Sequence, residues 1–162
     1  MSYNKFLKDL VKGEQTEAQL SNYYQSKGFK EVSRRGKGVE WDLVLQSPKS
    51  NKIKSFEIKT DFYVTEPGMG GMWIEFECRG KDSGIRTTTA DKWAHYFYHI
   101  NQLWVTDVQT IKDLLEEYTF NTSWYSGDKG SNTKGYIVEC NEPLIKKHFE
   151  IVDVDLKLYN KI

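Results

Sequence analysis

This chain contains few cysteines and histidines, and neither positive nor negative charge is in excess. Its 162 residues include two cysteines and three histidines, and 23 Lys and Arg residues offset 23 Asp and Glu residues. Cys78 and Cys140 are too few for a disulfide framework and lack metal-binding spacing. His95 and His99 lie four residues apart, but no third ligand nearby supports a zinc site. A net charge of zero removes the simplest argument for nucleic-acid binding, which is a local excess of Lys and Arg, but allows a basic patch offset by an acidic face.

Long apolar runs and nucleotide-binding motifs are also missing. No apolar run approaches membrane-spanning length, and the opening Met-Ser-Tyr-Asn does not resemble a signal peptide. The segment 126–130 lacks the Gly-Lys-Ser/Thr ending of a phosphate-binding loop, so nucleotide hydrolysis gains no support. No motif for a nucleophilic Ser or Cys is present. We expect a reduced, cytoplasmic, intracellular protein whose residues 1–162 form one domain.

Aromatic residues, in contrast, are abundant at 14% of the chain, and the length suffices for a sizeable core. Periodicity and turn residues predict an α/β (α+β) chain, with a helix, three or four neighbouring strands, a second helix and then mixed elements. A helix over 14–27 ends at Gly28, and Gly13 separates it from an earlier helical segment. The elements expected after it are strands at 29–32, 39–45, 53–60 and 72–78, a helix from Ala90 capped by Thr89, a strand at 103–105, a helix over about 106–118, a polar loop at 121–135, a strand at 136–140, a short helix at 144–149 and a final segment at 151–156.

The strand at 53–60 carries the most informative spacing. Because alternate side chains of a strand share a face, Phe56 and Ile58 point into a core while Glu57 and Lys59 point the other way. The turn at 47–51 predicts a hairpin with the preceding strand. Antiparallel pairing then brings Asp42 to the same end of the sheet as Glu57 and Lys59. A carboxylate, an ammonium and a second carboxylate meeting there could bind a divalent metal beside a cation.

Glu17 is a candidate fourth member of this group. It lies three residues before Leu20 and seven before Tyr24, on the apolar side of the first helix. A carboxylate there is costly unless it is paired or binds a ligand. The alternative is that Glu17 borders the apolar stripe and extends to solvent, and the sequence favours neither interpretation.

Two glycine-containing basic segments could contact phosphates. The loop at 33–38 contains Arg34, Arg35 and Lys37 and leads into the strand of Asp42. The segment 79–92 contains Lys81, Arg86 and Lys92 and is rich in glycine and hydroxyl groups. A phosphate clamp competes with a solvated turn in the first case and with an ordinary capped loop in the second.

The pattern of a Glu-bearing first helix, Asp42, and Glu57-Ile58-Lys59 on the next strand resembles the PD-(D/E)xK nuclease superfamily. Within this restriction-endonuclease-like group the chain is similar to small phage or archaeal Holliday-junction-resolvase-like proteins. The resemblance covers roughly residues 14–100 and implies a restriction-endonuclease-like core there, with a mixed central β-sheet flanked by helices, and a C-terminal elaboration at 101–162. One departure is that Trp41, not proline, precedes Asp42.

The resemblance implies an enzyme that hydrolyses phosphodiester bonds of DNA with Mg²⁺ or Mn²⁺, as an endonuclease or exonuclease. Asp42, Glu57 and the Ile58 carbonyl would bind the metal, Lys59 would act on the attacking water or on charge at the phosphate, and Glu17 would hold a second metal or orient Lys59. Related nucleases often act as homodimers. Alternatives are a non-catalytic nucleic-acid-binding module on the same fold and a phage structural or interaction protein with Glu57 and Lys59 as a surface ion pair.

Overall fold

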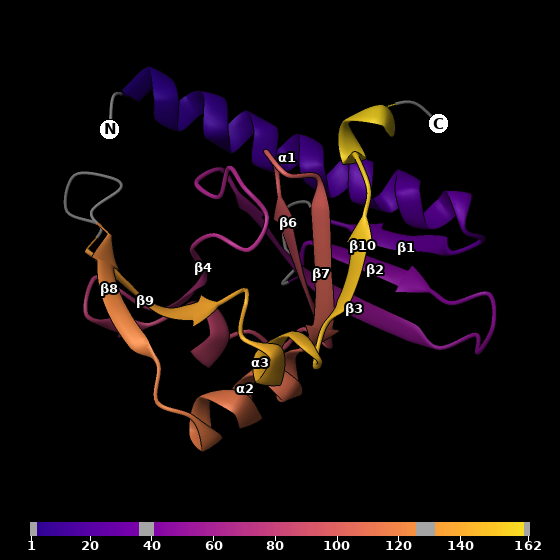
Figure 1. Ribbon diagram of the computed structural model, residues 1–162. Helices are drawn as coiled ribbons and strands as arrows, with labels where there is room; N and C mark the ends of the chain where they lie inside the picture. Colours follow the sequence, from indigo (N-terminus) through magenta and orange to yellow (C-terminus); the bar gives the residue numbers. More distant parts are fainter. Residues whose placement is uncertain (1–2, 36–40, 126–131, 161–162) are drawn as a thin grey trace.

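The computed structural model describes residues 3–35, 41–125 and 132–160, which form two β-sheets with helices packed on them (Figure 1). One sheet has six strands in the order β1-β2-β3-β6-β7-β10, and the other has four in the order β5-β4-β9-β8. The elements are α1 (Tyr3–Ser26), β1 (Lys30–Arg34), β2 (Leu43–Gln46), β3 (Ile53–Asp61), β4 (Gly71–Cys78), β5 (Lys81–Asp82), η1 (Gly84–Arg86), β6 (Lys92–Phe97), β7 (Gln102–Asp107), α2 (Val108–Glu117), β8 (Asn121–Tyr125), β9 (Thr133–Glu139), α3 (Pro143–Lys146), β10 (Glu150–Asp153) and η2 (Leu156–Leu158).

The long helix α1 lies across one face of the six-stranded sheet, at the top of Figure 1. It runs through Gly13 without a break, so the predicted interruption there was wrong. Gly28 adopts the left-handed backbone conformation, with φ at +91°, and its N–H bonds to the Gln25 carbonyl, which confirms the predicted helix end. Within the described ranges, α1 included, no helix combines the length and hydropathy needed to cross a membrane.

The six-stranded sheet is mixed, which confirms the predicted fold class. β2 and β3 pair antiparallel with Leu43 opposite Phe56, as the predicted hairpin requires. β3 pairs parallel with β6, with Lys59 opposite His95, while the other pairs in this sheet are antiparallel. β3 is therefore a central strand, and its far end runs beside β6.

The predicted helix from Ala90, capped by Thr89, was wrong. Residues Lys92–Phe97 form strand β6 at the centre of the sheet. Trp93 and Phe97 pack into the core on one face, and Ala94 and Tyr96 into the core on the other. A strand buried on both faces shows no polar alternation, so its apolar spacing resembled that of a helix.

Smaller differences lie in the C-terminal half. The predicted polar loop at 121–135 contains strand β8, which pairs with β9. α2 begins at Val108, with Asp107 at its N-cap instead of Thr106. The short helix expected at 144–149 is the single turn α3, and the segment expected at 151–156 contains β10. The strand expected at 39–45 begins at Leu43, and residues 39 and 40 lie outside the described ranges.

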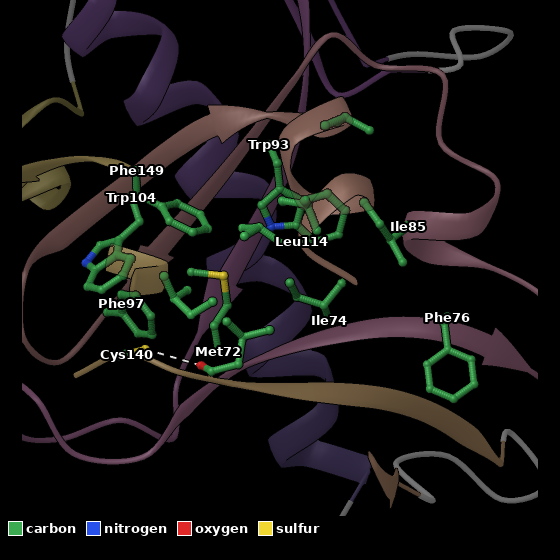
Figure 2. Packing of buried hydrophobic residues seen from close by; sticks show 14 of the residues in the cluster. Met72, Ile74, Phe76, Ile85, Trp93, Phe97, Trp104, Leu114, Cys140 and Phe149 are labelled. Carbon is green, nitrogen blue, oxygen red and sulfur yellow. Dashed lines mark hydrogen bonds between the residues drawn. The ribbon is translucent and has the colours of Figure 1, made fainter. Parts of the chain in front are cut away.

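Two apolar clusters cover the two faces of the six-stranded sheet. Leu20 of α1 packs against Phe56, Ile58 and Tyr96 on one face. On the other face, side chains of the four-stranded sheet and of α2 meet those of β6 and β7. Figure 2 shows this second cluster, whose labelled members are Met72, Ile74, Phe76, Ile85, Trp93, Phe97, Trp104, Leu114, Cys140 and Phe149. Polar side chains at the end of β3 therefore lie at the border of two cores.

Two glycines give opposite expectations for stability. A Cβ at Gly135 of β9 would collide with the indole of Trp73, whereas a Cβ at Gly13 would meet nothing within 4 Å. We expect Gly135→Ala to lower the free energy of unfolding by about 1–3 kcal/mol because of overpacking. Gly13→Ala should raise it by roughly 0.5–1 kcal/mol, because alanine is the better helix former. Denaturant unfolding of both variants measures this, and equal effects would contradict the described packing.

Candidate active site

The site forms where β3 extends past the end of its neighbour. β2 begins at Leu43, opposite Phe56, so within the described residues β3 pairs only with β6 from Glu57 to Asp61. Among the described residues, no strand pairs with the other edge of β3 over this stretch, which is called the open edge of β3 below. An open edge exposes backbone N–H and C=O groups that need partners.

Asp42 lies directly at this open edge. Its backbone N–H donates to the Phe56 carbonyl (3.1 Å), and its Oδ2 accepts from the Ile58 N–H (2.7 Å). The Arg35 N–H donates to the Asp42 carbonyl (2.9 Å), so the chain is held on both sides. The side chain is buried, with 6% of its area exposed. Asp42 thus lies beside Glu57 and Lys59 at the same end of the sheet, as the hairpin predicted.

The Ile58 carbonyl faces the same open edge. In a strand the N–H and C=O of one residue point to the same side. The Ile58 N–H bonds to Asp42, whereas the Asp61 carbonyl accepts from the Tyr98 N–H, on the β6 side. Residues 57, 59 and 61 therefore pair toward β6, and Ile58 directs its carbonyl toward Asp42.

Arg35 joins the helix to the sheet. Its Nη1 lies 3.2 Å from Asp42 Oδ1 and 3.7 Å from Glu17 Oε1. The Glu17 side chain is 14% exposed, so it does not extend freely into solvent. The structure thus places Glu17 next to Asp42, through an arginine that the sequence had suggested only for phosphate contact.

Glu57 and Lys59 form an ion pair on the opposite face of β3 from Phe56 and Ile58. Lys59 Nζ lies 3.0 Å from Glu57 Oε1 and 5.7 Å from the centre of the Trp93 ring. The Lys59 side chain is half-buried, which limits the number of positions its ammonium can take. The pair is close enough to Asp42 for both charges to act on the Asp42 pKa.

Burial dominates the electrostatics of the two acids beside Arg35. It raises the pKa of Glu17 to about 7, with a further upward contribution from the Asp42 charge that Arg35 partly offsets. Burial also raises the pKa of Asp42, against the Ile58 N–H, which lowers it. Two acids that are both costly to ionise, and that repel each other, favour a bound cation.

A cavity of about 460 Å³ opens beside these groups. Its lining includes Glu17, Arg35, Ile58, Lys59 and Thr60. The available donors are carboxylate and carbonyl oxygens, which fit Mg²⁺ or Mn²⁺ held by one or two carboxylates, with water and substrate oxygens as further ligands. Among the described residues, no three His, Cys, Asp or Glu side chains converge into a closed metal cluster.

The predicted phosphate-binding residues are spread over several places. Arg34 pairs with Glu31 (2.7 Å), and Lys37 lies outside the described residues. The others, Lys81 in β5, Arg86 in η1 and Lys92 in β6, do not line the cavity beside Glu17. Arg86 pairs with Asp82 (3.2 Å), and Lys92 pairs with Asp107 (2.6 Å). Of the five that the structure describes, Arg35 is the one that lies against Asp42.

Sequence reasoning missed His95 and Asp61 as neighbours of Lys59. His95 lies opposite Lys59 in the β3–β6 register, and its Nε2 is 3.6 Å from Asp61 Oδ2. Burial would raise the pKa of Asp61, but His95 and the N–H groups of Val64 and Tyr63 outweigh it and lower the pKa. The segment of His95 had been predicted as a helix, so no signal in the sequence pointed to this arrangement.

Comparison with protein-family models gives no match, and comparison with curated proteins gives none. Among solved structures, the bacterial homing endonuclease I-Ssp6803I is similar to this chain at a TM-score of 0.49 and 14% sequence identity. The similarity covers 82% of this chain and 80% of that chain. At this identity and TM-score it does not assign a function to this protein.

The Glu17 environment predicts a dependence of stability on pH. Between about 4.5 and about 7 the unfolded chain loses the Glu17 proton while the folded chain retains it, so stability falls as pH rises through this window. We expect Glu17→Gln to remove this loss, which is on the order of 1–2 kcal/mol. Thermal unfolding across this range should show the two proteins diverging as pH rises.

The matched control is Glu116→Gln, on the exposed side of α2. It reports the effect of removing a surface carboxylate. A wild-type protein that parallels Glu17→Gln at every pH would contradict the described burial of Glu17.

Proposed function

We propose that this protein hydrolyses phosphodiester bonds of DNA at a metal-assisted site formed by Asp42, Glu57, Lys59 and Glu17. The observation that carries the proposal is the open edge of β3. There Glu17 and Lys59 line one cavity, Asp42 is joined to Glu17 through Arg35, and Glu57 is paired with Lys59.

The role proposed for each residue follows from its position in the site. Asp42 and Glu57, with the Ile58 carbonyl, are the groups that would hold Mg²⁺ or Mn²⁺. When bound, such an ion polarises a phosphoryl oxygen and acidifies a coordinated water. The Lys59 ammonium, fixed by Glu57 at 3.0 Å, offsets the negative charge that develops on the phosphoryl group. Glu17 acts through Arg35, which it helps to hold against Asp42.

The reaction is a simple substitution at phosphorus. The oxygen of a water molecule forms a bond to phosphorus, and the bond from phosphorus to one sugar oxygen breaks. The water gives up a proton to solvent or to a carboxylate, and the leaving oxygen takes one up. No oxidant or covalent enzyme intermediate is needed. The cavity beside Lys59 provides the space for the phosphate.

A non-catalytic nucleic-acid-binding module is the second candidate, and the position of Arg35 favours it. Its guanidinium already neutralises Asp42 and Glu17, at 3.2 and 3.7 Å. A site stabilised in this way could hold a phosphate without a metal ion. Such a protein would bind DNA equally well in EDTA and in Mg²⁺, and would cut it in neither.

Lys59→Ala tests the proposed enzyme most simply. We expect wild-type protein to cut DNA in Mg²⁺ or Mn²⁺ and not in EDTA, and we expect the variant to lose about 10²-fold or more in rate, because a charge-stabilising group is removed. The assay follows supercoiled, linear, single-stranded and four-way-junction DNA on gels.

Lys134→Ala is the matched control. Lys134 is ion-paired with Glu77 at 3.2 Å, so this variant also removes a paired, partly buried lysine, but from the second sheet. It should cut at the wild-type rate. Undiminished cleavage by Lys59→Ala would refute the role of Lys59, and binding without cleavage in every metal would favour the second candidate.

A further inference from the structure

A second cavity, of about 640 Å³, lies between the two sheets on the other side of Lys59. β3, β4, β6 and β9 all contribute to its walls. Lys59 and Thr60 line both this cavity and the one beside Glu17, so the two spaces adjoin at these residues. Lys59 and Thr60 thus form the boundary between the two cavities.

His95 is the buried polar group of this second cavity. The residue is 3% exposed, and neither ring nitrogen has a hydrogen-bond partner among the described residues. Asp61 Oδ2 lies 3.6 Å from Nε2, within ion-pairing distance, so Nδ1 is the ring nitrogen for which the described residues offer no partner. A buried polar atom without a partner is costly, so Nδ1 calls for an explanation. A ligand that donates to or accepts from the imidazole supplies one.

The rest of the wall suits a flat ring. The indole of Trp73 packs closely on Gly135 of β9, where the Cβ of any larger residue would collide with it. This contact holds the indole in one position. Tyr63 stands at the rim with 66% of its surface exposed, and Ile137 adds an aliphatic wall. Aromatic side chains arranged around a cavity are the usual stacking surfaces for nucleobases.

The charges of the wall exclude a phosphate as the preferred ligand. Asp61 and Glu139 both line the cavity, and together they outnumber Lys59, which is already paired with Glu57. A phosphate would meet two carboxylates there. A neutral heterocycle with donor and acceptor groups on its edge meets His95, Asp61 and aromatic surface, and no net repulsion.

We propose that this second cavity binds an unpaired nucleobase of the nucleic acid whose phosphate lies at Lys59. This inference rests on the proposed function, and it narrows the substrate to DNA that presents an extrahelical or single-stranded nucleotide beside the scissile phosphate. Shared lining by Lys59 and Thr60 gives the connection between base and phosphate. Unstacking a base costs least where it is already unpaired, so paired duplex should bind less well.

The test uses the whole protein and two oligonucleotide duplexes, one fully paired and one with a single unpaired 2-aminopurine, in EDTA to prevent cleavage. We expect the unpaired duplex to bind about tenfold more tightly, with quenching of the 2-aminopurine fluorescence by stacking. Tyr63→Ala, at the exposed rim, should reduce this preference severalfold. His95→Phe, which keeps a flat ring but removes both ring nitrogens, should do the same.

Tyr3→Ala is the control, because Tyr3 is an exposed aromatic residue on α1 that lines neither cavity. It should keep the wild-type preference. Equal binding of the two duplexes by wild-type protein, or a preference unchanged in both cavity variants, would overturn the inference. Cleavage in Mg²⁺ is followed in parallel. Cleavage without the preference refutes this inference alone, and the preference without cleavage refutes the proposed function alone.

Discussion

The hydrogen bond from the Ile58 N–H to Asp42 Oδ2, at 2.7 Å, is the constraint on which the site depends. This bond lies at the open edge of β3, just beyond the point where β2 begins at Leu43. It gives the Ile58 N–H a partner at a position that β2 does not reach. A carboxylate so deeply buried is costly, and burial raises the pKa of Asp42. Arg35 and the Ile58 N–H offset part of that cost, so the local fold and the charge of the site stabilise each other.

The alternation of side chains along β3 determines how the neighbouring groups are arranged. Phe56 and Ile58 of this strand pack under α1, so Glu57 and Lys59 point to the opposite face, toward the second sheet, and Lys59 lines both cavities. Two of the acids there have a basic partner, since Arg35 forms an ion pair with Asp42 and Lys59 forms one with Glu57. The two proposals follow from this arrangement, with a phosphate on one side of Lys59 and a neutral ring on the other.

The sequence predicted those parts of the fold and site in which local pattern and environment agree. Alternation in β3 and the turn before it were enough to bring Asp42 to Glu57 and Lys59, because hairpin register depends on neighbouring residues. β6 could not be predicted in this way. Its residues are buried on both faces, and a buried strand and a buried helix have similar apolar spacing. With a helix predicted there, the sequence did not place His95 beside Lys59. That position depends on a parallel pairing between distant segments. The contact of Arg35 with Glu17 also depends on tertiary packing, so no local sequence pattern predicts it.

The most direct measurement of the central claim is a titration with Mn²⁺ followed by NMR, since paramagnetic broadening reports distance from the ion. The account predicts that the backbone amide signals of Asp42 and of Glu57 to Lys59 broaden first, that those of α2 stay sharp, and that Asp42→Asn abolishes the selective loss. Broadening that begins elsewhere, or that is the same in Asp42→Asn, would contradict a metal-assisted site at the open edge of β3.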